Sequence, residues 1–462
     1  MQAEETGLTS GDVNQYYFNN PAQPGSPVQT QLTQTSKEDP NILLGYHRQW
    51  SPGNDTLFLY RHVEEYYTLG DPAFPITFDG PGPTALINTA YADQTELNSL
   101  EAQHIFQTDS QRLILGFRYQ KEDDQVANTL NGPYPFAAQP SLDTDFWRVT
   151  GYAYYQLKLF DMLRLTGGGT YDAMRFPENI ANPPVSRQEE ERNRLSPKAG
   201  VDWTPDNNTR VRAAYTESMS GLFNASSTLI EPSEIAGFNQ AFRSILPEAT
   251  VPGASFETLG VGADHKFPTR TYVSIEGDML HSRADQMLGI FTSSSVLPTP
   301  DTISSDVQHL DIRERDLYAN IDQLIGNELS VGAGYHLTAA NISYDNRVLN
   351  PPASAAGQFK SANQATLNQI DLFANYYVSC GFFSQIQLNW WKQADVNFTP
   401  EEAGANFWQL NLFAGYRFPR RHVEVMLGLL NVTDRNYQLD PLTYYVGPAH
   451  SRTLEASFKF SF

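Results

Sequence analysis

The feature that most constrains this chain is a strict alternation of apolar and polar residues. In the last nine residues an apolar side chain stands at every second position back from Phe462, and polar residues such as Lys459 stand between. A period of two predicts β-strands with one apolar and one polar face. The polar positions are often Gly, Ser, Asn, Gln or charged residues, which suit a water-filled lumen better than a dry core. The same alternation covers residues 113–120, 163–171, 329–337, 370–378, 384–390 and 408–418.

The connections between these segments alternate in length. Outer-membrane β-barrels have this arrangement because their periplasmic turns are short and their extracellular loops are long. A soluble sandwich or a propeller has no reason to alternate in this way. Short turns are expected near 51–54, 108–110, 160–161, 204–208, 267–270, 326–327, 379–381 and 419–420. Long polar connections are expected at 71–93, 122–143, 177–193, 221–253, 292–305, 346–363 and 434–450, with a shorter one at 400–405.

The pattern therefore predicts an all-β fold, a transmembrane antiparallel up-and-down β-barrel of about 16–18 strands with short periplasmic turns and long extracellular loops. Residues 41–462 are assigned to the barrel. Residues 1–40 are assigned to an N-terminal lead-in, or to an additional strand near Asp12–Asn19 followed by a loop. A barrel of this size encloses a lumen rather than a filled core. The connection 221–253 is the longest, and we expect it to lie outside the cell.

Composition excludes several classes of protein. No apolar run approaches the length of a membrane helix, so the chain is not a helical membrane protein. The net charge of −21 argues against nucleic acid as a partner, because phosphate backbones attract basic surfaces. With Cys380 as its only cysteine, the chain forms neither an internal disulfide nor a thiolate metal cluster. The acidic start does not resemble a secretion signal, so either a signal was removed or the chain is the C-terminal part of a longer one.

The C-terminal region resembles the last two strands of TonB-dependent receptors. Residues 428–437 read GLLNVTDRNY, and residues 451–462 read SRTLEASFKFSF. In that family an N-L-x-D-x-x-Y element precedes a final strand that ends in an aromatic residue. Asn431, Asp434 and Tyr437 match this spacing, although a valine stands at the leucine position. The stretch 195–218 is similar to a central hairpin of the same barrels.

The resemblance implies an outer-membrane transporter or receptor of a Gram-negative bacterium, which mediates passage or binding of a solute and is not an enzyme. It implies outer-membrane lipid and the barrel-assembly machinery as partners, and an energy-coupling inner-membrane complex if a plug domain lies upstream. The first forty residues are too short for a plug, so we expect the plug not to be present in this chain. Three alternatives stay open: an export barrel behind a periplasmic helical-repeat module, an outer-membrane hydrolase, and a secreted soluble β-protein.

The terminal strand resembles the signal that the barrel-assembly machinery recognises. An unclosed barrel has an exposed strand edge, which is a template for pairing with another strand. Phe458, Phe460 and Phe462 would carry this signal, with Phe462 at the periplasmic interface. In the strands nearest the C-terminus we expect one face to point toward lipid. This face is made by Leu410, Leu412, Leu427, Leu429, Phe458 and Phe460. We expect the other face toward the lumen, made by Gln409, Asn411, Glu424 and Lys459.

No motif in the sequence indicates catalysis, a cofactor or a metal. The chain has no HExxH, P-loop or G-x-S-x-G motif. Glu276 and Asp278 are predicted to face the lumen two residues apart, and a cation site or an acid pair there is the less favoured interpretation. The histidines are scattered and lack a second ligand at metal spacing. The charged run Arg187–Arg194 is interpreted as a solvated loop.

Overall fold

Antiparallel strands make up most of the chain in the computed structural model, which describes residues 9–10, 33–76, 85–131, 141–180, 185–221, 229–240, 251–292, 302–346, 360–396, 405–418, 423–435 and 451–460. The first long strands are β2 (Thr33–Ser51), β3 (Asn54–Ile76), β4 (Ala85–Gln107), β5 (Gln111–Asn131), β6 (Leu142–Leu159), β7 (Leu163–Pro177), β8 (Glu189–Asp206) and β9 (Thr209–Met219). The later ones are β12 (Ser255–Lys266), β13 (Thr271–Thr292), β14 (Thr302–Ile325), β15 (Leu329–Asn346), β16 (Lys360–Tyr377), β17 (Phe382–Val396), β18 (Asn406–Arg417), β19 (Val423–Leu430) and β20 (Thr453–Phe460). Three short strands complete the set: β1 (Thr9–Ser10), β10 (Glu234–Ile235) and β11 (Phe238–Asn239). Within these described ranges, no helix is long and apolar enough to cross a membrane.

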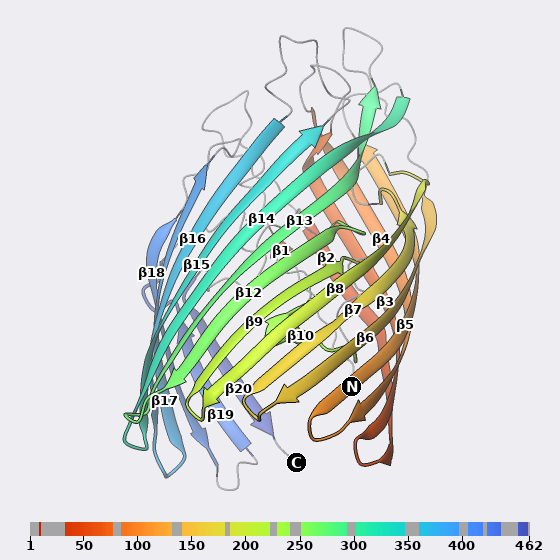
Figure 1. The fold of residues 1–462 in the computed structure, drawn as a ribbon. Coiled ribbons are helices and arrows are strands. Elements are labelled where there is room, and N and C mark those ends of the chain that lie inside the picture. The colour runs from red at the N-terminus through yellow and green to blue at the C-terminus, as the bar shows by residue number, and fades with distance from the viewer. Residues whose placement is uncertain are drawn as a thin grey trace.

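Each long strand pairs antiparallel with its neighbour in the chain, from β2 to β9 and from β12 to β20, and β9 pairs with β12. Together with β1, the described residues form one 18-stranded sheet, within the predicted range of sixteen to eighteen. The sheet curves around a central axis to form the tilted wall of a barrel (Figure 1). The predicted up-and-down β-barrel is therefore confirmed.

The short turns lie at one end of the barrel, and the strand ends that carry the longer connections lie at the other (Figure 1). The seven predicted turns from 51–54 to 379–381 separate consecutive strands as expected, and the turn at 419–420 lies outside the described residues. Gly53 and Gly381 have φ angles of 74° and 103°, which favour glycine. A Cβ at Gly53 would also overlap the carbonyl oxygen of Gln107 at the end of β4.

The two faces of the strands differ as the alternation predicted. On β5, Phe117 is 49% exposed on the outward face, whereas its neighbour Arg118 is buried on the lumen side. In the closing strands Leu427 and Phe458 are outward and exposed, whereas Gln409 is buried on the lumen side. Asn411 is also buried, and Glu424 lies opposite Lys459 in the β19–β20 ladder. The outward apolar band is the surface that contacts lipid.

The strands run further than predicted. β2 begins at Thr33 rather than near Asn41, so part of the segment assigned to the lead-in belongs to the sheet. The predicted additional strand at Asp12–Asn19 lies outside the described residues. β8 begins at Glu189, so the interpretation of Arg187–Arg194 as a loop is wrong for most of that run. Beyond the membrane both faces of a strand meet water, and polar side chains there give no alternation to detect.

Candidate functional site in the barrel lumen

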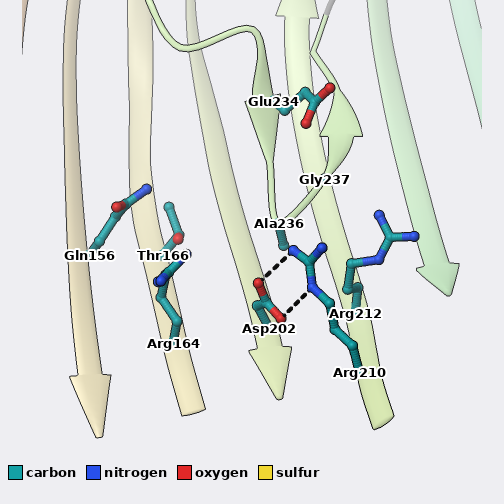
Figure 2. Close-up of a pocket in the computed structure, with 9 residues that line it drawn as sticks. All are labelled: Gln156, Arg164, Thr166, Asp202, Arg210, Arg212, Glu234, Ala236 and Gly237. Carbon is teal, nitrogen blue, oxygen red and sulfur yellow. Dashed lines mark hydrogen bonds and ion pairs between the residues drawn. The ribbon is translucent and has the colours of Figure 1, made fainter. Parts of the chain in front are cut away.

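The described part of the longest connection, residues 229–240, folds into the lumen. β10 and β11 pair antiparallel around Ala236 and Gly237, which have φ angles of 50° and 87°. Figure 2 shows this segment, the lumen hairpin, in front of the inner wall. The expectation that the connection 221–253 lies outside the cell is therefore wrong for its central part. The physical reason is that this segment carries apolar side chains that find a complementary surface inside the barrel.

A row of small residues on the wall seats the lumen hairpin. Gly200 on β8, Ala214 on β9 and Gly260 on β12 are consecutive partners across the sheet. Ile235 and Phe238 pack here and are only 2% and 4% exposed. A Cβ at Gly200 would lie 2.6 Å from the Ile235 side chain, and one at Gly260 would meet the Phe238 ring. Larger wall residues would therefore exclude the hairpin. The same apolar cluster includes Ile114, Tyr152 and Tyr154.

Two carboxylates, those of Glu101 and Glu231, anchor the start of the lumen hairpin. Glu101 on β4 accepts hydrogen bonds from the backbone N–H of Glu231 at 2.8 Å and of Ile230 at 3.1 Å. The Tyr152 hydroxyl donates to the same carboxylate at 2.8 Å. The backbone of the hairpin is thereby fixed to the wall, and Gln103 supports it by donating to the Ile230 carbonyl oxygen at 2.6 Å.

Glu231 makes the contacts between the hairpin and the charged side chains of the wall. Its carboxylate lies 3.1 Å from Nη1 of Arg118 and 3.9 Å from Nζ of Lys198, and it accepts a hydrogen bond from the Tyr154 hydroxyl at 2.6 Å. Arg118 and Lys198 are each 5% exposed or less. Buried charges are tolerated when they are paired and hydrogen-bonded, and removal of one partner is strongly destabilising. Glu231 therefore couples the hairpin to three strands of the wall, β5, β6 and β8.

A cavity of about 440 Å³ lies below the tip of the lumen hairpin, toward the short turns (Figure 2). Arg210 donates to Asp202 through Nε at 2.9 Å and through Nη2 at 2.7 Å, a bidentate ion pair. Arg212 donates to Glu276 at 2.9 Å. Guanidinium groups and carboxylates in a water-accessible space can exchange hydrogen bonds with a polar solute. The cavity is lined by Gln156, Arg164, Thr166, Asp202, Arg210, Arg212, Glu234, Ala236 and Gly237.

One residue of the acidic pair that the sequence singled out lies at this site. Glu276 faces the lumen as predicted, and it pairs with Arg212 at the edge of the cavity. Asp278 lies on the same face of β13. Among the described residues, no group of three or more His, Cys, Asp or Glu side chains could hold a metal ion.

The family-motif residues form a turn at the end of β19. Asn431 is fully buried, and its side chain bonds the backbone of Arg435 through both Nδ2 and Oδ1. Asp434 accepts a hydrogen bond from the backbone N–H of Arg452 at 2.8 Å, which ties the turn to the start of β20. Tyr437 lies outside the described residues. The described part of the motif thus holds the last two strands together.

Sequence reasoning missed the central residues of the site. Arg118, Tyr154, Lys198 and Glu101 all occupy lumen-facing positions that the alternation could have marked. Nothing local could show that they converge on Glu231, because Arg118 and Glu231 are 113 residues apart. A charged residue on the lumen face near the middle of a strand is the signal that was available.

The sequence from residue 3 to residue 432 matches the family model described as TonB dependent receptor-like, beta-barrel. The chain belongs to this family. TonB-dependent receptor barrels are proteins of the bacterial outer membrane, so the outward apolar band of this barrel lies in that membrane. The family comprises receptors and transporters rather than enzymes. None of the curated proteins matches the sequence.

Solved structures of the family share the fold of this TonB-dependent receptor-like barrel. The ferripyoverdine receptor of the Pseudomonas aeruginosa outer membrane has a TM-score of 0.57 and 14% identity over 94% of this chain and 57% of its own. The ferric citrate transporter FecA has a TM-score of 0.56 and 14% identity over 93% of this chain and 61% of its own. BauA, the ferric preacinetobactin receptor of Acinetobacter baumannii, has a TM-score of 0.56 and 14% identity over 95% of this chain and 64% of its own. The chain thus spans less than two thirds of each of these proteins.

Proposed function

We propose that this barrel is the membrane-spanning part of an outer-membrane receptor that binds a solute and lets it pass, and that the lumen hairpin is the constriction on that path. The observation that carries the proposal is the position of the hairpin, which touches the inner wall from β4 at Gln103 to β12 at Gly260. A solute that moves along the lumen must pass this segment. The cavity below its tip offers charged and polar groups to a hydrated solute.

The solute class that the comparisons support is a metal chelate. Two of the similar proteins are a ferripyoverdine receptor and a ferric citrate transporter. The family match favours uptake over the export barrel and the hydrolase that the sequence left open. Uptake would engage an energy-coupling inner-membrane complex as a partner if a plug lies upstream in the protein.

The barrel-assembly machinery is the second partner that we propose. Phe458 and Phe460 lie on the outward face of β20 and are 64% and 61% exposed, which supports a role as a recognised edge. Phe462 lies outside the described residues, and its place in the signal stays a prediction.

A disulfide lock tests the constriction. A Cβ at Gly200 would lie 3.0 Å from the Cβ of Ala236, near the range of about 3.5–4.5 Å in disulfides. The variant Gly200→Cys/Ala236→Cys also carries Ile235→Ala, which removes the Cγ2 atom that a Cβ at Gly200 would meet at 2.6 Å. It is made in a Cys380→Ser background, so that the exposed native thiol cannot react. In planar lipid bilayers we expect low conductance when the pair is oxidised and stepwise openings after reduction. The same variant without Gly200→Cys is the control, because it cannot be locked. Equal conductance before and after reduction of the pair would contradict the proposal.

A further inference from the structure

The connection between β7 and β8 continues the ladder of these strands past its last strand pair. Its described residues are 178–180 and 185–188, which we call the latch. Two backbone hydrogen bonds of 2.9 Å each join the two arms of the latch. Their N–H donors belong to Glu178 and Ser186, and their carbonyl acceptors belong to Gln188 and Asn179.

The latch rests on the lumen wall. Ile180 is 6% exposed and packs against Val126 on β5 and Leu142 on β6, two buried residues of the inward face. The hydroxyl of Tyr91 on β4 donates to the carbonyl oxygen of Ile180 at 3.1 Å and lies 3.4 Å from Oδ2 of Asp93. Tyr91 therefore links the latch to a carboxyl group of the wall.

Three lumen-facing carboxyl groups lie beside this contact, and we call them the acid cluster: Asp93 on β4, and Glu122 and Asp124 on β5. Asp93 is the ladder partner of Val126, on which the latch packs. Glu122 and Asp124 are only 3% and 2% exposed. Thr95 donates to Oδ1 of Asp124 at 3.0 Å. The acid cluster is thus part of the surface that the latch covers.

The acid cluster lacks donors. In the part of the chain that the structure describes, no donor reaches Oδ1 of Asp93, Oε2 of Glu122 or Oδ2 of Asp124, although all three atoms are buried. An ionised carboxylate can only accept hydrogen bonds, whereas a protonated carboxyl group also donates one. Protonation therefore suits this arrangement, because it removes buried charge and lets neighbouring carboxyl groups bond to each other.

The strongest charge contacts of the acid cluster are with other carboxylates. Glu65 on β3, opposite Thr95 in the ladder, and Asp123 on β5 both add negative charge beside it. Arg61 on β3 and Arg148 on β6 lie in the adjoining row toward the membrane, and Arg148 donates to Asp172 at 2.9 Å. The other titratable groups of the packed elements are Tyr67, Tyr91, Glu178 and the exposed Arg187.

Burial raises the pKa of Asp93 to about 6 and that of Asp124 to about 7, and the neighbouring carboxylates add to both shifts. Burial also raises the pKa of Glu122 well above its usual range. These groups lie beyond the bilayer, because the outward side chains beside them are the exposed ion pair of Lys121 and Asp123. A raised pKa in the docked state means that docking takes up protons. Docking is therefore favoured at low pH and is lost as the pH rises through about 6 to 7.

We propose that the latch is a proton-sensitive device, which docks on the lumen wall while the acid cluster is protonated and is released when the cluster ionises. Ionised carboxylates repel one another and require water, which opposes the packing of Ile180 beside them. Release of the latch uncovers the lumen wall at the end of the barrel that carries the long connections (Figure 1).

The test is hydrogen–deuterium exchange of the full chain in lipid nanodiscs, read by mass spectrometry in peptides that cover residues 177–188. A short hairpin is only marginally stable in water, so release of the latch exposes its hydrogen-bonded amides to exchange. The protection of these amides is compared at about pH 5.5 and about pH 8, on either side of the raised pKa values. Rates are corrected for the chemical pH dependence of exchange.

Two charge-matched triple variants separate the acid cluster from surface charge. Asp93→Asn/Glu122→Gln/Asp124→Asn removes every ionisable group of the cluster and keeps the shapes of the side chains. Glu96→Gln/Asp123→Asn/Asp143→Asn is the control, because it changes exposed outward carboxylates on the neighbouring β4, β5 and β6. Heat-modifiable gel mobility verifies that both variants fold.

We expect protection of the latch in the unmodified chain to fall at least about tenfold between the two pH values, the factor for one proton over one pH unit. The control should show the same fall, whereas the cluster variant should stay protected within about twofold at both pH values. Constant protection in the unmodified chain would overturn the proposal, and so would an equal fall in the cluster variant. Low protection of the cluster variant at both pH values, or loss of the pH dependence in the control, would overturn it as well.

Discussion

Replacement of Gly260 by alanine tests whether the shape of the wall holds the lumen hairpin. A Cβ at Gly260 would lie 2.5 and 2.7 Å from Cε1 and Cγ of Phe238, whereas carbon atoms in contact are about 3.5–4.0 Å apart. The ring, which is 4% exposed, would have to move by about 1 Å in a closely packed site. Overpacking of this kind costs about 1–3 kcal/mol. We therefore expect the ratio of open to closed hairpin to rise by about 5- to 150-fold.

Single-channel recording in planar bilayers measures that ratio as the fraction of time spent in the high-conductance state. Gly262→Ala is the matched control, because it lies on the same strand and face and its Cβ would meet its nearest neighbours, Arg212 and Glu276, at 3.4 and 3.5 Å. A second change, Phe238→Leu, should restore closure in the Gly260→Ala variant by making room for the new methyl group. Indistinguishable open fractions in Gly260→Ala and Gly262→Ala would refute the idea that the glycine seat holds the hairpin.

Three further predictions concern charge, the membrane face and assembly. Glu231→Gln leaves the buried Arg118 with a weaker partner and should raise the open fraction in the same recordings as much as Gly260→Ala does, whereas Glu234→Gln, at an exposed position, should not. Leu427→Arg on the lipid face should destabilise the barrel by about 2–4 kcal/mol in lipid unfolding assays, and the adjacent lumen-facing Met426→Arg should cost much less. Deletion of Phe462 should leave stability in detergent nearly unchanged but reduce membrane insertion in cells; equal insertion would remove the case for a terminal signal.

Much of the barrel could be predicted because its determinants are local. The period of two identified strands and assigned Phe117 and Arg118 to opposite faces, since successive side chains of a strand point to opposite sides. Residues that favour turns located the short connections, because only a few backbone conformations close a hairpin. The closing region around Asn431 and Asp434 identified the family, which the match over residues 3–432 confirms.

The sequence by itself therefore determined the fold class, the turns and the two faces, and the tertiary structure alone decided what occupies the lumen. Residues 229–240 carry apolar side chains such as Ile235 and Phe238, but nothing in the segment shows which surface they pack against. The conformation that they adopt depends on partners far along the chain. Gln103 is 127 residues from Ile230, to whose carbonyl oxygen it donates, and Glu101 is 130 residues from Glu231. Such contacts arise only when the closed wall brings β4, β5, β8 and β12 around one segment. Burial against that wall, rather than any local preference of its sequence, is what draws the hairpin inward.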